Sequence, residues 1–313
     1  HQVTRAMPIV STSTSAFSER ARRDMKDLRT QAENYQAQMS SGSKLERSSD
    51  NPVAASRLRA LARQEKLSGI DQTSARRANA DLSLADAAMS DMADALIHAQ
   101  ELAMRASSST LTDIQRASIG EELDQIFNNL LSLANARDSS GHALFGGESA
   151  GDAYALDASG KAVYVGTTGS RELPLGDGQS VTPSLTGPTF LSFGAADGSV
   201  TDLLTVVHTL GQALKGGSAD PAGAAGNALA DLRTGLDTLS TGQTVIGTRL
   251  AWIDVTDDRR VNLSELRSSE EADLGGVDLA TALAQLQETM TVLEASQASF
   301  TRLASLSLFD RMG

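Results

Sequence analysis

The residues of this chain that could act as nucleophiles, acids or bases lack the partners that such chemistry needs. Residues 41–44 read Ser-Gly-Ser-Lys, the Ser-x-x-Lys spacing of penicillin-binding enzymes, but the accompanying Lys-Thr-Gly sequence occurs nowhere in the chain. The carboxylate pairs at 257–258 and 270–271 could serve as general acid and base. Adjacent carboxylates on a helix are more often part of a solvated face, so we expect no enzyme activity and no catalytic residue.

Metal and cofactor sites are also absent from the sequence pattern. The chain has no cysteine, which removes disulfides, thiolate nucleophiles and zinc sites of the cysteine type. Its histidines show no metal-ligand spacing and form no His-Glu-x-x-His motif; they are His1, His98, His142 and His208. No glycine-rich phosphate loop or calcium loop is present. We therefore expect no metal and no cofactor.

The charge of the 313 residues is distributed unevenly. Residues 1–77 contain 14 Lys and Arg against 8 Asp and Glu, a net charge of +6, whereas residues 78–313 contain 13 against 31, a net charge of −18. The pattern fits solvated helix faces, or a basic end that docks on an acidic surface of a neighbouring subunit. The acidic bulk argues against nucleic acid as a main ligand. No apolar run is long enough to cross a bilayer, so we expect no membrane segment.

The two ends of the chain carry the same apolar pattern. Near each end, apolar residues alternate at spacings of three and four, which is typical of a coiled-coil seam that is buried against another helix. The first seam contains Met25, Leu28, Ala32, Tyr35 and Met39, and the last contains Leu283, Leu286, Met290, Leu293 and Phe300, with Gln297 as a polar interruption. We expect the ends to pair with each other or with the same positions in adjacent subunits, and we predict that these apolar residues form an assembly interface.

A break separates the first seam from the next helix. Ser41 and Gly42 are placed to end the first helix with a glycine cap. Asp50 or Asn51 could accept the free N–H groups of a new helix, and Pro52 suits its first turn. We therefore predict an inter-domain loop that contains Ser41, Gly42, Asp50 and Pro52.

An Ala-rich helical array follows from about residue 52 to 137. Thr112 and Gln115 have the spacing of a capping box, which predicts the start of a further helix. The longest stripe of the array contains Ala78, Leu82, Ala85, Met89, Met92, Leu96, Ala99 and Ala103. Alanine on such a seam permits close approach of helices, and the methionines are expected to pack in the core.

Residues 141–200 differ in character, because Gly, Thr, Ser and Asp interrupt short apolar runs at 162–165, 173–175 and 189–191. Turn sequences at 157–160 and 177–178 predict hairpins. Helical patterns then return at 203–214 and after Pro221. The later stripe contains Leu229, Leu232, Leu236, Leu239, Gln243, Ile246, Leu250 and Ile253.

These patterns predict a mainly α fold. Its N- and C-terminal segments form a long nested helical hairpin, a coiled-coil shaft with a small β-rich inserted domain. We predict a terminal coiled-coil (inner tube) domain from residues 1–49 with 270–313. A helical shaft domain would comprise 50–145 with 205–269, and a β-rich surface domain 146–204. Residues 275–278, Gly-Gly-Val-Asp, interrupt the last helical pattern.

Several short motifs resemble the flagellin superfamily, and within it the hook-associated proteins of the FlgL type. Ser41-Gly42 with residues 49–55 (SDNPVAA) is similar to the SG…SDDPVAA loop of that family, with asparagine in place of the second aspartate. Other similar segments follow in the family's order: 141–147 (GHALFGG), 187–190 (GPTF), 246–250 (IGTRL) and 305–310 (SLSLFD). Filament flagellins share the paired terminal helices, but their loop usually reads SAKDDAAG, without the proline.

The resemblance implies a structural, self-assembling protein at the junction between hook and filament, polymerised through its terminal helices in a helical or ring assembly. The implied partners are further copies of the chain, another hook-associated protein on the hook side, flagellin on the filament side and an export chaperone. The implied location is the extracellular flagellum, reached through the flagellar type III system without a cleaved signal peptide. Two alternatives stay open: a filament flagellin and a coiled-coil surface protein that binds a ligand through residues 141–200.

Overall fold

The computed structural model describes residues 10–44 and 51–312, and the chain divides into two units. One unit comprises residues 1–65 and 263–313, and the other comprises residues 66–262. Two long helices, α2 (Pro52–Ala106) and α6 (Pro221–Gly275), each contribute to both units. The mainly α fold predicted from the sequence, with a small strand-containing insertion, is confirmed.

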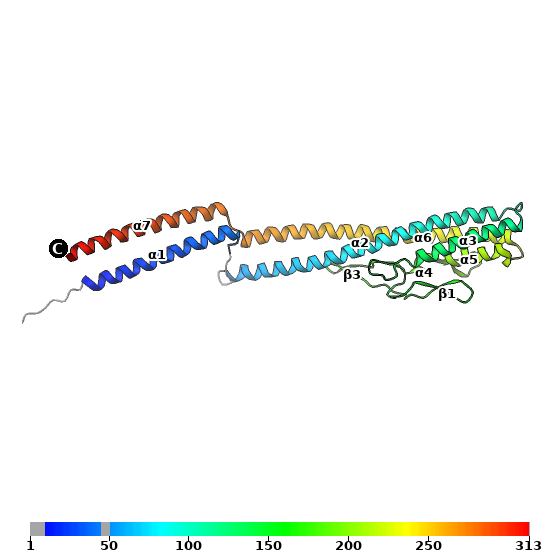
Figure 1. Cartoon of the computed structure of the whole chain (residues 1–313), viewed down its shortest axis with the longest axis horizontal. Coiled ribbons are helices and arrows are strands. Elements are labelled where there is room, and N and C mark those ends of the chain that lie inside the picture. Colours follow the sequence, from blue (N-terminus) through cyan, green and yellow to red (C-terminus); the bar gives the residue numbers. More distant parts are fainter. Residues whose placement is uncertain (1–9, 45–50, 313) are drawn as a thin grey trace, which may run out of the picture. The chain divides into compact units, whose positions relative to one another are not determined.

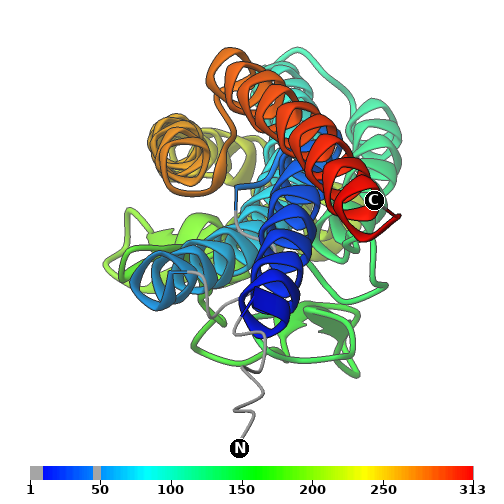
Figure 2. The same cartoon turned by 90° about the vertical axis from the view of Figure 1, so that its left-hand side faces the viewer.

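In the unit formed by the chain ends, α1 (Val10–Ser41) and α7 (Leu279–Met312) pack side by side, as Figures 1 and 2 show from two directions. The start of α2 and the end of α6 belong to the same unit. Leu61 of α2 is fully buried there. The expected interruption at 275–278 is the connection between α6 and α7, so it ends one helix and begins another.

The second unit has one continuous hydrophobic core between α2, α3 (Asp113–Ala134), α5 (Leu203–Gln212) and α6. All eight residues of the predicted α2 stripe are buried. On α6, Leu232, Leu239, Ile246 and Ile253 are buried at intervals of seven, with half-buried residues of the same stripe between them. This is the burial expected of a coiled-coil-like seam.

The starts of the helices follow the capping residues in the sequence. The Thr112 side chain accepts a hydrogen bond from Gln115 N at 3.2 Å, and Gln115 Oε1 accepts one from Thr112 N at 3.0 Å, which completes the predicted capping box. Asn51 Oδ1 accepts a hydrogen bond from Ala54 N at 3.1 Å, so Asn51 caps α2. The N–H groups that helix formation leaves free are satisfied locally in both cases.

The insertion contains three antiparallel hairpins rather than one sheet. β1 (Tyr154–Leu156) pairs with β2 (Ala162–Tyr164), and β3 (Leu173–Gly176) pairs with β4 (Gln179–Val181). Both turns lie where the sequence predicts them. Asp177, with φ of 52°, and Gly178, with φ of 71°, form the second turn.

The third hairpin corrects one expectation. The apolar run at 189–191 is part of a short helix, α4 (Gly187–Leu191), because Pro188 suits its first turn. The strand β5 (Ser192–Gly194) begins only afterwards and pairs with β6 (Val200–Asp202). The helical pattern at 203–214 is likewise divided, because a π-helical turn, η1 (Ala213–Gly217), follows α5.

Candidate assembly interface

The side of α1 that faces α7 is the predicted seam. Ala21 and the five predicted seam residues of α1, Met25, Leu28, Ala32, Tyr35 and Met39, are half-buried. Most intervening positions are exposed, and none of the α1 side chains that the structure describes is fully buried. One helix partner therefore covers this stripe only in part.

The inward side of α7 uses a different heptad frame from the one that the sequence suggests. Leu286 is buried, and Leu293 and Phe300 are half-buried. They alternate with Ala282, Thr289 and Ser296, whose side chains also face inward. Small residues at these positions allow α1 and α7 to approach closely. Sequence reasoning missed them because it favoured the larger apolar residues.

The remaining predicted residues of α7 lie on the flank of this seam. Leu283 and Met290 are each 43% exposed, and Gln297 is exposed. Because Leu286, Leu293 and Phe300 belong to both heptad frames, the two readings differ only in which neighbouring column faces α1. The structure thus brings together eight of the ten predicted apolar residues and leaves Leu283 and Met290 on the surface.

The predicted loop is partly described. Gly42 has φ of +68° and its N–H donates to Gln38 O at 2.9 Å, so it ends α1 in the left-handed conformation that glycine favours. Ser41 is exposed, and Pro52 is the first residue of α2. Lys44 N donates to Gly275 O at 2.6 Å, which ties the end of this turn to the end of α6. Asp50 lies outside the described residues.

Two ion-pair clusters join α2 to α6 beside the terminal helices. Arg57 donates two hydrogen bonds to Glu270, at 2.5 and 2.8 Å. Glu65 accepts from Arg267 Nε at 2.9 Å and from Ser264 Oγ at 2.8 Å. Hydrogen bonding to Arg57 lowers the pKa of Glu270, and hydrogen bonding to Ser264 and Arg267 lowers that of Glu65. Glu270, the first carboxylate of the 270–271 pair, is therefore part of a structural ion pair.

Several other candidate chemical groups also have structural partners. His98 Nε2 lies 2.8 Å from Glu122 Oε1, and the His208 ring lies 5.0 Å from the Phe127 ring. Asp257 pairs with Arg260 on the same helix. His1 lies outside the described residues. Within the described ranges, no group of three or more His, Cys, Asp or Glu could hold a metal ion, and no helix has the length and apolarity of a membrane span.

Known proteins have similar sequences and a similar fold. The family model described as the bacterial flagellin N-terminal helical region matches residues 12–150. The flagellar hook-associated protein 3 of Escherichia coli strain K12 is 29% identical over 295 residues, covering 88% of this chain and 91% of that protein. The match therefore extends over most of the chain.

Solved structures show the same fold. A putative flagellar hook-associated protein from Vibrio parahaemolyticus is 21% identical, with a TM-score of 0.66 over 72% of this chain and all of that one. The flagellar junction protein FlgL from Legionella pneumophila is 13% identical, with a TM-score of 0.58 over 70% of this chain and all of that one. The sequence matches, together with the shared fold, support a FlgL-type protein of the flagellin superfamily.

Proposed function

We propose that this chain forms the junction between the flagellar hook and the filament, and that α1 and α7 join it to neighbouring copies. The role is structural, as expected of a protein similar to the flagellar hook-associated proteins. Its location is the flagellum, where it assembles with hook and filament components. A filament flagellin is the disfavoured alternative, because the match to hook-associated protein 3 covers 88% of the chain.

The observation that carries this proposal is the apolar surface left uncovered on α7. Leu279, Leu283 and Met290 are exposed on one flank of the seam, and Val292, Leu303 and Leu306 are exposed on the other. A turn of 100° per residue separates the two sets on opposite sides of the Leu286–Leu293 line. A soluble helix seldom exposes apolar residues on two flanks, whereas a helix with a neighbour on each side would bury both.

This arrangement fits a closed or helical assembly of identical chains. In such an assembly each subunit presents two different surfaces to its two neighbours. We infer that the loop through Ser41, Gly42, Asp50 and Pro52 connects a terminal coiled-coil domain, 1–49 with 270–313, to a helical shaft, 50–145 with 205–269. Residues 146–204 form the surface domain of this proposal.

The finer parts of the proposal concern partners and chemistry. We infer contacts with another hook-associated protein on the hook side and with flagellin on the filament side. We also infer delivery by an export chaperone and the flagellar type III system, without a cleaved signal peptide. The chain would work through its seams without catalysing a reaction, which agrees with the ion-paired state of Glu270 and Asp257.

Variants of α7 test the interface. In cells that lack the gene, Met290→Asp and Leu303→Asp are expected to be secreted but not incorporated, because each places a charge in an apolar contact. Ala298→Asp is the matched control, since Ala298 is exposed on the face of α7 that points away from the seam. Incorporation is measured by immunoelectron microscopy of the hook tip, and folding by circular dichroism of the purified monomer. Equal incorporation of all three variants would refute the interface.

A further inference from the structure

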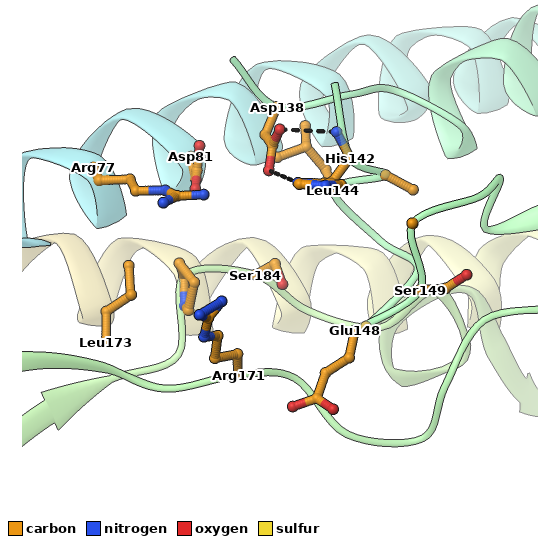
Figure 3. A pocket seen from close by; sticks show the side chains of 14 residues that line it. Arg77, Asp81, Asp138, His142, Leu144, Glu148, Ser149, Arg171, Leu173 and Ser184 are labelled. Atoms are coloured by element: carbon orange, nitrogen blue, oxygen red, sulfur yellow. Dashed lines mark hydrogen bonds and ion pairs between the residues drawn. The ribbon is translucent and has the colours of Figure 1, made fainter. Parts of the chain in front are cut away.

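A cavity of about 460 Å³ lies within the second unit. It is bounded by α2, by the segment that follows α3 (residues 138–150), by β3 and the residue Arg171 before it, and by residues 183–184. Figure 3 shows Asp81 and Asp138 on one side of this space, and Arg171 with Ser184 on the other. The volume is within the range of small-molecule sites.

Asp81 is the unusual residue of this cavity. It is only 6% exposed, and its Oδ1 atom has no hydrogen-bond partner among the described residues. A buried carboxylate without a partner is costly, and such groups are rare in folded proteins. Burial raises the pKa of Asp81, and the charge of Asp138 raises it further, while Arg77 acts in the opposite direction. Oδ1 has almost no accessible surface, so a ligand in the cavity would reach the Asp81 carboxylate through Oδ2.

Asp138, by contrast, is fully engaged in shaping the loop over the cavity. Its Oδ1 accepts hydrogen bonds from Ser140 N at 2.8 Å and from His142 N at 3.0 Å. Its Oδ2 lies 4.0 Å from His142 Nδ1. The loop at 138–142 is thereby held in one conformation, and a second carboxylate is fixed beside Asp81. The cavity is thus preorganised.

The charge and lining of the cavity indicate the kind of ligand. Three carboxylates, Asp81, Asp138 and Glu148, line the cavity with two guanidinium groups, Arg77 and Arg171. The acidic side chains therefore outnumber the guanidinium groups by one. Arg77 donates to Ser140 Oγ at 3.4 Å and forms no ion pair with Asp81 within the described ranges. The described residues contain no cluster that could hold a metal ion. An organic monocation would neutralise the excess negative charge, and its N–H groups would donate hydrogen bonds to the Asp81 carboxylate.

We propose that this cavity binds an ammonium or guanidinium group on a short aliphatic stem, with Asp81 as the principal acceptor. The apolar side chains of Leu144 and Leu173 line the same space and would contact the stem. The group belongs either to a free small amine or to a Lys or Arg side chain of a second copy of this chain. The inference does not depend on the junction role.

The test is a titration of the ¹⁵N-labelled full chain with n-butylammonium, followed by NMR. We expect saturable shifts of the His142, Leu144 and Glu148 amides with a Kd on the order of 1–10 mM, given the few atoms of the ligand. The isosteric controls n-butanol and n-butyrate should give no saturable shifts. Saturation by butyrate, or by none of the three, would overturn the proposal.

Variants locate the binding to Asp81. Asp81→Asn should raise the Kd at least tenfold, whereas Asp94→Asn, an exposed aspartate on the same helix, should leave it unchanged. Arg171→Glu changes an exposed residue at the cavity and should lower the Kd several-fold. An unchanged Kd in both Asp81→Asn and Arg171→Glu would contradict the assignment.

Sedimentation in the presence of n-butylammonium distinguishes a free small amine from a Lys or Arg side chain of a second copy as the natural occupant. If the natural occupant is a basic side chain of a second copy, the probe lowers concentration-dependent self-association of the chain. If it is a free amine, the probe binds and self-association does not change.

Discussion

At the scale of single residues, the buried charges of the second unit differ in how well they are satisfied. Arg116 is 8% exposed, and its guanidinium donates to Ala106 O at 3.2 Å and to Ser108 O at 2.8 Å, where α2 ends. It therefore replaces the hydrogen bonds that the last carbonyls of a helix lack. Asp81 has similar burial but retains an acceptor oxygen without a partner. The hydrogen-bonded Arg116 therefore stabilises the fold, whereas the incompletely hydrogen-bonded Asp81 destabilises it.

Asp81→Asn is expected to stabilise the free protein at neutral pH by about 1 kcal/mol, because it removes a buried charge whose hydrogen bonds are incomplete. The pKa of Asp81 is raised in the folded state, so the folded state binds the proton more tightly than the unfolded state. The contribution of Asp81 to the free energy of unfolding should therefore fall as pH rises from the ordinary aspartate pKa through the raised value, and level off above it. Glu65 and Glu270, whose pKa values are lowered, contribute in the opposite direction.

Urea unfolding of the wild type and of both variants between pH 3.5 and 7.5 measures this dependence. The free energy of unfolding of Asp81→Asn, relative to the wild type, should rise across this range, whereas that of Asp94→Asn should show no such rise. A variant that is less stable than the wild type at pH 7.5 would show that Asp81 forms a favourable charged interaction.

At the scale of helices, glycines on α6 mark where other elements approach. A Cβ atom at Gly242 would lie 2.6 Å from Phe190 Cβ and 2.9 Å from Met89 Cε, whereas a Cβ at Gly247 would meet no atom within 4 Å. Close packing of α4 and α2 against α6 therefore depends on the missing side chain at Gly242. Gly247 has no such role.

The two positions give opposite predictions for the same substitution. Gly242→Ala should destabilise the protein by about 1–3 kcal/mol through overpacking. Gly247→Ala should stabilise it by about 0.5–1 kcal/mol, because alanine has the better helix propensity. Thermal melts followed by circular dichroism compare both with the wild type. If the two variants change the Tm in the same direction, the packing of α4 against α6 is not as described.

The helices could be predicted from the sequence because their burial repeats along the chain. The α2 stripe from Ala78 to Ala103 is buried throughout, and the capping box at Thr112 starts α3. The choice between the Leu283 and Ala282 columns of α7 was not predictable, because both share Leu286 and the partner helix decides. The 189–191 run lies in the short helix α4 within an insertion otherwise rich in strands, because Pro188 suits a first helical turn.

Only one feature of the sequence indicates the cavity, the position of Asp81. Asp81 lies three residues after Ala78 and four before Ala85, which places a carboxylate within an apolar stripe. That position alone indicates an unusual burial. The residues that face Asp81 come from a loop and from β3, at distances along the chain that no local pattern relates. Only the folded structure shows that these residues lie together.

At the scale of the whole molecule, the two units differ in how their helices are covered. The 66–262 unit has a continuous core with many fully buried side chains. The described α1 side chains are at best half-buried, and the described part of α7 buries only Ala282, Leu286 and Thr289. Hydrophobic burial is the main stabilising term, so in the monomer the terminal helices are the weaker part. In the assembly, neighbouring copies would bury the apolar side chains of α1 and α7 that the monomer leaves exposed.

Hydrogen exchange measures this difference. Amides of α1 and α7 in the monomer are expected to exchange at least tenfold faster than those of residues 78–103 in α2, because local opening exposes less apolar surface there. In assembled flagella the protection of α1 and α7 should rise. Equal protection of both regions in the monomer would show that the helix pair is stable without neighbours.

The central claim, that the chain is the adaptor on which the filament starts, is tested most directly in cells that lack the gene. Electron microscopy of the cell surface is combined with an assay for flagellin in the medium. Bare hooks with flagellin shed into the medium are the predicted result, because the filament would have no subunit to which it could attach. Filaments that are missing or shortened without shed flagellin would contradict the claim and indicate a filament subunit.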